Sequence, residues 1–544
     1  MSALLAIEDL CVRLPKGADR AFALDGVSLA LAPDEILCVV GESGSGKSML
    51  ANAVMRLLPT GVHASGGRIL FQGDDLLAKS EEEMRPIRGA RVAMIFQEPM
   101  TALNPLRAIG DQIGEMFTVH TDLGGAEIER RTLALLEEVR IPDPAGAARA
   151  YPHELSGGQR QRAMIAMALA LEPAALIADE PTTALDVTTQ ARILDLIRDL
   201  QKRRGTAVLF ITHDFGVVAE IADRVAVMQD GVVVEQGPAQ TILNRPQHPY
   251  TRALIAAVPP LSPPPARAVS TTPVLRIEGV SKTYRSGGMF RRGRRATKAV
   301  SNVTLDLPKG GTLGIVGESG SGKSTLARCI VRLLDPDSGS IRLGDTDLAT
   351  LSRKAMRRET RRIQMVFQDP YGSLNPRRRA GELVAQGPIV HGTARKQAMA
   401  RARELFALVG LDPEAADRYP HEFSGGQRQR IGLARALALE PEVLVADEPV
   451  SALDVSVQAQ VLHLLADLRE RLGLSMIFIT HDLRVAAQIC DHIAVMKDGE
   501  VVEAGPTAAV FAAPAHPYTR ALLAAVPGRG WLPPVAFAPA RAAS

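Results

Sequence analysis

Two identical octapeptides hold residues whose types and spacing suggest phosphate chemistry. GESGSGKS occupies Gly41–Ser48 and occurs again at Gly317–Ser324. The pattern GxxxxGK[ST] predicts a phosphate-binding loop, because its glycines let backbone N–H groups approach phosphate oxygens and the helix that follows adds its positive end. We expect the lysines to reach the β- and γ-phosphates of a nucleotide and the last serines to bind Mg²⁺. The candidate nucleotide-binding residues of these loops are Gly41, Ser43, Gly44, Gly46, Lys47 and Ser48 in the first copy and Gly317, Ser319, Gly320, Gly322, Lys323 and Ser324 in the second.

Pairs of neighbouring carboxylates follow two apolar runs. ALIADE ends at Asp179 and Glu180, and VLVADE ends at Asp447 and Glu448. We expect the aspartates to hold Mg²⁺ through water and the glutamates to polarise a water molecule that attacks phosphate. Carboxylates at the end of a strand could instead make ordinary surface contacts. The phosphate loop upstream of each pair favours the catalytic interpretation.

Two glycine-containing pentapeptides form the third repeated motif that could bind phosphate. LSGGQ lies at Leu155–Gln159 and FSGGQ at Phe423–Gln427. A serine at a helix N-cap followed by two glycines leaves several backbone N–H groups free, which suits a γ-phosphate. An ordinary capped helix would have the same start, but its repetition beside phosphate loops favours a binding role. The candidate residues are Ser156, Gly157, Gly158 and Gln159, with Ser424, Gly425, Gly426 and Gln427 in the second copy.

Hydrophobic patterning indicates the elements that must position these residues. Ile36–Val40 is a short apolar run that ends in the first phosphate loop, and a helical pattern begins at Lys47. Further candidates for buried strands are Ala174–Ala178, Ala207–Thr212, Val443–Ala446 and Ser475–Thr480. Strands that alternate with helices predict an α/β fold with a mostly parallel sheet in each half.

The motifs occur twice in the same order, which predicts two colinear domains. The segment HPYTRAL, for example, begins at His248 and again at His516. Between the copies lies PPLSPPPARAVSTT, a proline-rich stretch of the kind that is extended and joins domains with little constraint. We predict a first domain over residues 1–258, a linker over 259–272, and a second domain over 273–544 that ends in a tail rich in proline and alanine.

Composition restricts the class of protein further. The 544 residues include 63 basic and 60 acidic side chains, so a net charge of +3 gives no global attraction to nucleic acid or to an anionic membrane. The sequence has no run of about 18 apolar residues and no signal peptide at its start. We therefore expect a cytoplasmic chain whose role at a membrane depends on a partner. The basic segment Gly287–Arg295 is expected to be a solvated loop, with contact to lipid or a permease as the alternative.

Together these motifs resemble those of the ABC ATPase family over nearly the whole chain. The resemblance implies two tandem P-loop nucleotide-binding domains, each with a mostly parallel core sheet, an antiparallel β subdomain and a helical subdomain. It also implies that the two domains pair head to tail within the chain and enclose two ATP molecules. One site would join Lys47, Ser48, Gln97, Asp179, Glu180 and His213 to Ser424–Gln427, and the other would join Lys323, Ser324, Gln368, Asp447, Glu448 and His481 to Ser156–Gln159.

The same resemblance implies roles for residues outside the three motifs. Gln97 and Gln368 would contact nucleotide and Mg²⁺, and His213 and His481 would contact the γ-phosphate. A histidine after a strand is more often structural, but the shared ITHD context favours the catalytic role. Aspartates in two ALD turns, Asp186 and Asp454, would link the two sites.

Longer segments resemble one branch of the family, the oligopeptide, dipeptide and nickel importers. These segments are FQEPMTALNP, FQDPYGSLNP and the two copies of HPYTRAL. The fused form is most similar to the ATP-binding subunits of microcin C and peptide importers. The resemblance implies two membrane permease subunits as partners, a periplasmic solute-binding protein reached through them, no nucleic acid, and a position on the cytoplasmic face of the bacterial inner membrane. The segments around Met100 and Tyr371, with the LNP motifs, would contact the permeases.

The chain departs from that branch in two respects. Many of its members carry a cysteine cluster for an iron–sulfur centre after HPYTRAL, whereas the four cysteines here are far apart, so we expect ATP and Mg²⁺ but no iron–sulfur cluster. The adenine-stacking aromatic residue corresponds to Tyr284 in the second copy but to Leu14 in the first, where Phe22 is the nearest other aromatic. We therefore expect the first site to bind ATP more weakly.

Two other functional classes fit the motifs less well. A soluble ABC protein that acts on the ribosome or on nucleic acid would carry a long charged linker or zinc-binding cysteines, and this sequence has neither. An exporter usually carries membrane spans in the same chain. Both alternatives rest on family analogy, and neither is excluded by the chemistry of the sites.

Overall fold

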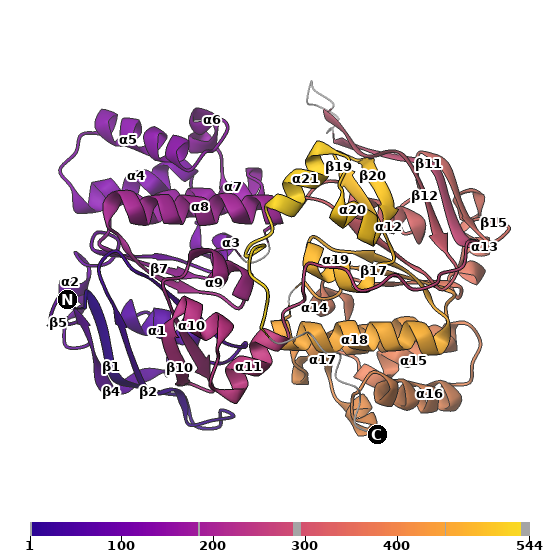
Figure 1. Ribbon diagram of the computed structural model, residues 1–544, viewed down its shortest axis with the longest axis horizontal. Coiled ribbons are helices and arrows are strands. Elements are labelled where there is room, and N and C mark those ends of the chain that lie inside the picture. The colour runs from indigo at the N-terminus through magenta and orange to yellow at the C-terminus, as the bar shows by residue number, and fades with distance from the viewer. Residues whose placement is uncertain (1–2, 183–184, 287–294, 452, 535–544) are drawn as a thin grey trace. The chain divides into compact units, whose positions relative to one another are not determined.

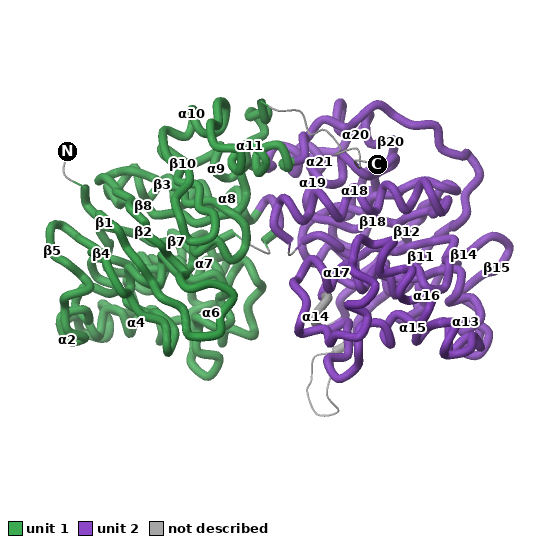
Figure 2. The backbone as a smooth tube through the Cα atoms, turned by 90° about the horizontal axis from the view of Figure 1, so that it is seen from below, with its two compact units in different colours: residues 1–185, 189–258, 527–536 green, residues 186–188, 259–526, 537–544 purple. Residues whose placement is uncertain are grey.

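The computed structural model describes residues 3–182, 185–286, 295–451 and 453–534. The chain divides into two compact units, each of which contains one copy of the motifs (Figure 2). Unit 1 consists of residues 1–185, 189–258 and 527–536, and unit 2 consists of residues 186–188, 259–526 and 537–544.

A six-stranded sheet forms the core of unit 1 (Figure 1). Its strand order is β10-β9-β3-β8-β7-β6, and every neighbouring pair is parallel except β9 and β10. The central strands β3, β7 and β8 are buried along their whole length, as the unbroken apolar runs predict for a parallel sheet covered on both faces. The strands are β3 (Ile36–Val40), β6 (Val92–Ile95), β7 (Ala175–Asp179), β8 (Ala207–Ile211), β9 (Arg224–Gln229) and β10 (Val232–Pro238).

A second, antiparallel sheet covers one side of this core. Its order is β2-β1-β4-β5, with β1 (Leu5–Arg13), β2 (Phe22–Leu31), β4 (His63–Phe71) and β5 (Asp74–Asp75). The alternating apolar residues of β1, such as Leu10 and Val12, share one hydrophobic cluster with Val39 of β3 and Leu209 of β8. The burial of these side chains holds the two sheets together.

The helices of unit 1 include a separate helical subdomain. Helices α4, α5 and α6 contact one another, and α4 and α5 also contact α7. The helices are α1 (Lys47–Val54), α2 (Glu81–Met84), α3 (Pro99–Ala102), α4 (Ile109–His120), α5 (Gly125–Glu138), α6 (Pro144–Arg149), α7 (Gly157–Leu169), α8 (Val187–Arg204), α9 (Phe215–Ile221), α10 (Ala239–Asn244) and α11 (Pro249–Ala256), with a 3-10 turn η1 at Pro152–Glu154.

Unit 2 repeats this architecture. Its core sheet has the order β16-β17-β18-β13-β19-β20, and its antiparallel sheet has the order β12-β11-β14-β15. The strands are β11 (Pro273–Ser286), β12 (Arg295–Pro308), β13 (Thr312–Val316), β14 (Ser338–Leu343), β15 (Thr346–Asp347), β16 (Ile363–Val366), β17 (Val443–Asp447), β18 (Ser475–Ile479), β19 (His492–Lys497) and β20 (Glu500–Pro506). The predicted α/β class, with a mostly parallel core sheet, an antiparallel sheet and a helical subdomain in each copy, is confirmed.

The helices of unit 2 correspond to those of unit 1. They are α12 (Lys323–Ile330), α13 (Arg353–Glu359), α14 (Pro370–Ser373), α15 (Ala380–Val390), α16 (Arg395–Leu408), α17 (Gly425–Leu437), α18 (Val455–Leu472), α19 (Leu483–Ile489), α20 (Thr507–Ala512) and α21 (Pro517–Ala524), with 3-10 turns η2 (Leu348–Thr350), η3 (Pro413–Asp417) and η4 (Pro420–Glu422). Among the described residues, no helix has both the length and the apolar character that crossing a bilayer requires.

The proline-rich segment between the copies is held by unit 2. Gln488 of α19 donates hydrogen bonds to the carbonyl oxygens of Pro260 at 2.8 Å and Ser262 at 2.9 Å. The guanidinium of Arg267 binds both carboxylate oxygens of Asp491 at 2.7 Å. The segment is therefore more constrained than the expected tether, because its backbone carbonyls are satisfied by side chains of the core.

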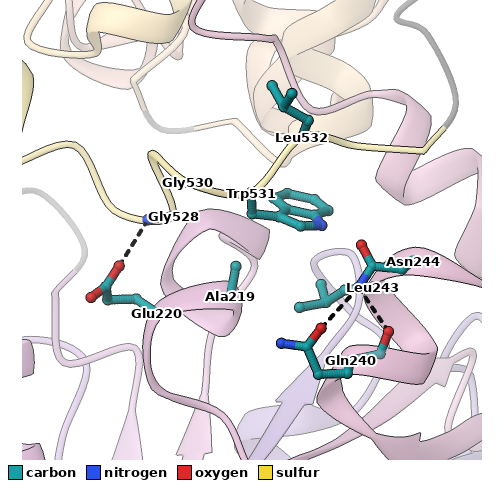
Figure 3. A pocket seen from close by; sticks show the side chains of 9 residues that line it. All are labelled: Ala219, Glu220, Gln240, Leu243, Asn244, Gly528, Gly530, Trp531 and Leu532. Carbon is teal, nitrogen blue, oxygen red and sulfur yellow. Dashed lines mark hydrogen bonds between the residues drawn. The ribbon is translucent and has the colours of Figure 1, made fainter.

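Residues 527–534, which follow α21, belong to unit 1. The N–H of Gly528 donates to a carboxylate oxygen of Glu220 in α9 at 3.3 Å, and Trp531 lines a pocket beside α10 (Figure 3). The other residues that line the pocket include Ala219, Gln240, Leu243 and Asn244. Residues 287–294 of the expected basic loop and the tail from residue 535 lie outside the described residues.

Candidate nucleotide-binding sites

Each phosphate loop joins a buried central strand to a helix, as the sequence predicts. In unit 1 the loop connects β3 to α1, and Gly46 takes a left-handed conformation with φ of 105° at the start of the helix. A Cβ atom there would lie 2.7 Å from the carbonyl oxygen of Ala23, so the position requires glycine. The buried Nζ of Lys47 donates to the carbonyl oxygens of Gly41 and Glu42, both at 2.8 Å. The loop thus holds a cation among backbone groups at a helix N-terminus, which fits a phosphate.

The second loop has the same geometry. Gly322 has a φ of 103° at the start of α12, and the Nζ of Lys323 donates to the carbonyl oxygens of Gly317 and Glu318, both at 2.7 Å. Burial lowers the pKa of Lys323. The identical octapeptides therefore have the same arrangement in both units.

The last serine of each loop meets the aspartate at the end of the neighbouring strand. The hydroxyl of Ser48 donates to Oδ1 of Asp179 at 3.1 Å, and Ser324 donates to Oδ1 of Asp447 at the same distance. Burial raises the pKa of Asp179 to about 6, and it also raises the pKa of Asp447. A hydroxyl and a carboxylate beside a phosphate loop are oxygen ligands of the kind that Mg²⁺ prefers. The residues present therefore fit the predicted ion.

Glutamate, glutamine and histidine form a second cluster in each unit. In unit 1 the carboxylate of Glu180 accepts a hydrogen bond from Gln97 Nε2 at 3.0 Å and lies 3.3 Å from His213 Nδ1. In unit 2 the corresponding distances from Glu448 to Gln368 and His481 are 2.9 Å and 3.2 Å. The ends of three core strands bring these side chains together, because the residues follow β6, β7 and β8 in one unit and β16, β17 and β18 in the other.

The hydrogen bond between Glu448 and His481 in unit 2 shifts the pKa of both side chains. Burial works against the charged form of Glu448, but its hydrogen bond with His481 lowers the pKa of the carboxyl overall. The same hydrogen bond raises the pKa of His481 despite the burial of the ring. An ionised glutamate that is oriented by two neighbours can accept a proton from water.

The glycine-containing pentapeptides begin helices α7 and α17 with reciprocal caps. The hydroxyl of Ser156 accepts from the N–H of Gln159 at 3.3 Å, and the side chain of Gln159 accepts from the N–H of Ser156 at 2.9 Å. Ser424 and Gln427 repeat this capping box. The exposure of both helix starts leaves them open to a ligand. Their pairing with the opposite phosphate loops remains a prediction.

The chain matches known proteins along most of its length. The ABC transporter family matches residues 24–183 and 300–451, and the C-terminal region of oligopeptide/dipeptide transporters matches residues 234–279 and 502–530. The peptidoglycan transport ATP-binding protein YejF of Agrobacterium fabrum (strain C58) is 49% identical over 96% of each chain. The glutathione import ATP-binding protein GsiA of Escherichia coli (strain K12) is 48% identical over 96% of this chain and 89% of its own.

The chain belongs to the ABC transporter family. It is accordingly an ATP-binding protein and an ATPase. A solved structure of the ATP-binding cassette MJ0796, a dimer in a post-hydrolysis state bound to ADP and Pi, is 31% identical over 43% of this chain and 98% of its own, with a TM-score of 0.39.

The residues expected beside the adenine of ATP differ between the two ABC units. Tyr284 lies near the end of β11 and is 42% exposed, whereas Leu14 follows β1 and packs against the hydrophobic core of unit 1. Phe22 pairs with Arg13 across β1 and β2, and the guanidinium of Arg13 lies 5.1 Å from the centre of its ring. Among these three side chains, only that of Tyr284 is exposed.

Two tyrosines that contact the ABC phosphate loops are not among the predicted site residues. Tyr250 and Tyr518 are the tyrosines of the two HPYTRAL segments, and each hydroxyl accepts the N–H of the second residue of a loop. The repetition of this segment, within a region that the oligopeptide/dipeptide transporter family also matches, was the signal that could have identified them.

Proposed function

We propose that this chain is the ATPase subunit of an importer for peptides or peptide-like solutes, and that it acts at the cytoplasmic face of the bacterial inner membrane. The observation that carries the proposal is the double match to the oligopeptide/dipeptide transporter region, in a chain with two phosphate loops whose last serines each bind an aspartate. The similar proteins are named for the import of glutathione, a small peptide, and for the transport of peptidoglycan.

In the proposed reaction each unit supplies one catalytic half-site, completed head to tail by the pentapeptide of the other. Lys47 binds the β- and γ-phosphates, Glu180 takes the proton of the attacking water, and His213 contacts the γ-phosphate. Ser48, Gln97 and Asp179 would hold Mg²⁺, which would supply positive charge to neutralise the phosphate oxygens. The second half-site uses Lys323, Glu448 and His481 in the same roles, with Ser324, Gln368 and Asp447 at the metal.

Two different permease subunits are the proposed partners, with a periplasmic solute-binding protein beyond them. The segments after Gln97 and Gln368 carry the expected docking surface. Leu103 and Leu374 of the LNP motifs are buried, while the asparagine and proline that follow each leucine are exposed. Leu106 beside the first motif is 83% exposed. The corresponding stretch in unit 2, Arg377–Arg379, has three arginines where Leu106–Ala108 has one, so the two surfaces differ in charge, which suits two non-identical partners.

The partners can be captured by photo-crosslinking in intact membranes. A photoreactive amino acid at position 106 should capture one membrane protein, and one at position 377 should capture a different membrane protein. The same probe at the exposed Val232 on β10 serves as the control and should capture neither. Capture of ribosomal protein or nucleic acid from positions 106 and 377 would contradict the importer assignment.

The solute class can be measured with the reconstituted transporter. ATP-dependent uptake of a labelled tripeptide should be inhibited by unlabelled peptides and unaffected by the free amino acids of the same composition. Inhibition by free amino acids alone would overturn the assignment to peptides.

A further inference from the structure

In both units hydrogen bonds hold the HPYTRAL segment, here called the arm, in one conformation. In unit 1 the carboxylate of Glu235 on β10 accepts the N–H groups of Gln247 at 2.7 Å and His248 at 3.1 Å. The ring of His248 then accepts the N–H of Tyr250 at 3.3 Å and caps α11, whose first residue is Pro249. Proline at the first helical position and a capped N–H fix the direction in which the tyrosine leaves the helix.

The same contacts occur in unit 2. Glu503 accepts the N–H groups of Ala515 at 2.7 Å and His516 at 3.0 Å, and His516 accepts the N–H of Tyr518 at 3.1 Å. A cation adds a further contact here, because Lys497 Nζ lies 5.1 Å from the centre of the Tyr518 ring. The arm is therefore a property of the repeated sequence and does not depend on one local environment.

Each tyrosine hydroxyl ends at a phosphate loop. The N–H of Glu42 donates to the hydroxyl of Tyr250 at 3.1 Å, and the N–H of Glu318 donates to the hydroxyl of Tyr518 at 3.1 Å. The Tyr250 hydroxyl in turn donates to the Glu42 carboxylate at 3.3 Å. The tyrosine thus fixes the backbone of the loop's second residue from the side of α11.

The residue that the tyrosine holds also carries a carbonyl oxygen that binds the phosphate-loop lysine. The N–H of Glu42 donates to Tyr250, and its carbonyl oxygen accepts from Lys47 Nζ at 2.8 Å. In the same way the N–H of Glu318 donates to Tyr518, and its carbonyl oxygen accepts from Lys323 Nζ at 2.7 Å. A shift of this residue would move the lysine and the loop together, since one residue carries both contacts.

We propose that Tyr250 and Tyr518 are positioning residues for ATP binding, each of which holds its phosphate loop in the conformation that receives the phosphates. The proposal concerns the ATPase itself and is independent of the solute. Its chemistry needs a neutral hydroxyl that can accept from the loop N–H. Burial raises the pKa of both tyrosines to about 12, so both hydroxyls remain protonated at physiological pH.

The test uses full-length chains in which only one site binds nucleotide. In a Lys323→Ala background, Tyr250→Phe should weaken ATP binding at the first site by about two- to tenfold, the effect of one neutral hydrogen bond. In a Lys47→Ala background, Tyr518→Phe should do the same at the second site. In otherwise unmodified chains, the KM of steady-state hydrolysis should rise by the same factor as the dissociation constant, with little change in kcat. The reason is that the loop binds the phosphates equally in the substrate and in the transition state.

A direct readout separates positioning from a general effect on folding. Hydrogen exchange in the peptide that spans residues 41–46 should become faster in Tyr250→Phe, while the peptide that spans residues 317–322 keeps its wild-type rate. Tyr151→Phe is the matched control, since it removes a hydroxyl from a tyrosine of unit 1 that is 42% exposed, and it should leave ATP binding and exchange unchanged.

Two results would overturn the proposal. One is unchanged ATP affinity and unchanged loop exchange in both phenylalanine variants. The other is a loss of binding free energy for ATP that is matched by an equal loss of unfolding free energy in the nucleotide-free protein. That result would assign the tyrosines to overall stability.

Discussion

At the scale of single residues, Glu180 and Glu448 are held in an unfavourable backbone conformation. Both have a φ of 46°, in the left-handed region that residues with a side chain adopt at a cost of about 1–3 kcal/mol. The strain persists because the N–H of each glutamate is bonded to a core strand, Glu180 to Ile211 and Glu448 to Ile479, both at 3.0 Å. The conformation aims the carboxylate at the glutamine and the histidine.

Replacement of these glutamates by glutamine should separate binding from hydrolysis. Glu180→Gln and Glu448→Gln keep the shape of the side chain but remove the base, so we expect ATP binding to remain and phosphate release to slow by about 10²–10⁴. Glu172→Gln is the control, because Glu172 also has a positive φ, of 52°, yet is exposed and precedes β7, whereas Glu180 follows that strand. Near-normal turnover in Glu180→Gln would make the first site structural.

The difference between Tyr284 and Leu14 should make the two sites unequal. Stacking of an aromatic ring on a base contributes about 1–3 kcal/mol, so the site of Lys323 should bind ATP more tightly than the site of Lys47. Affinities are measured singly, with Lys47→Ala or Lys323→Ala silencing the other site. Tyr284→Leu should weaken the second site about tenfold or more, and Leu14→Tyr should tighten the first. Equal affinities, together with no effect of Phe22→Ala, would show that stacking does not govern binding.

At the scale of elements, the first and second glycines of each pentapeptide have different structural roles. A Cβ atom at Gly158 of α7 would lie 2.9 Å from Thr189 Cγ2, and one at Gly426 of α17 would lie 2.5 Å from Val457 Cγ1. A Cβ atom at Gly157 or Gly425 would meet nothing within 4 Å. The second glycine therefore permits close packing against α8 or α18, while the first keeps the helix start open.

Alanine at the two glycines of one pentapeptide should affect different properties. Gly158→Ala should destabilise the protein by about 1–3 kcal/mol through overpacking against α8, as measured by chemical unfolding. Gly157→Ala is the matched control at the adjacent position and should leave the free energy of unfolding nearly unchanged. Equal destabilisation by both changes would contradict the packing role of Gly158.

The arms formed by α11 and α21 should give the protein an alkaline transition. The ordinary tyrosine pKa of 10.0 rises to about 12 in the folded state for Tyr250 and Tyr518. Below pH 10 both states keep the proton, and between these values the unfolded state loses it first, so the free energy of unfolding should fall as the pH rises from about 10 to about 12. The double change to phenylalanine should flatten this part of the curve. A wild-type pH dependence in the double variant would contradict the assignment.

At the scale of the whole molecule, sequence order and structural units do not coincide. The segment after α21 contributes to unit 1, and the segment after α11 contributes to unit 2. Each forms a hydrogen bond with the helix that follows His213 or His481, since Glu220 lies in α9 and Gln488 in α19. We propose that the predicted boundaries near residues 258 and 272 still delimit the two nucleotide-binding domains, with these segments as additions to them.

Trp531, the single tryptophan of the chain, should report the docking of the C-terminal segment (Figure 3). Its ring lies in a pocket on α9 and α10, so its fluorescence should be blue-shifted relative to the denatured protein. Glu220→Ala removes the hydrogen bond to Gly528 and should shift the emission to the red, whereas Glu172→Ala should not. An emission maximum that is the same for wild type and Glu220→Ala would show that this hydrogen bond does not hold the segment.

The sequence by itself determined the repeat, the α/β class and the positions of the two phosphate loops. Local patterns suffice for these features: the five-residue apolar run Ile36–Val40 before a glycine loop predicts a buried strand, and Ser156 with Gln159 defines a helix cap within four residues. Strand limits were predicted to within about one residue, as Ala174–Ala178 against the observed Ala175–Asp179 illustrates.

Only the tertiary structure decided which distant residues share a contact. The bond from Tyr250 to Glu42, the bond from Gln488 to Pro260, and the return of residues after Val526 to unit 1 all join segments far apart in the chain. Such contacts depend on the order of strands in the sheet and on side chains that satisfy backbone groups across the core. No local pattern encodes that order, because it is set by the free energy of the packed whole.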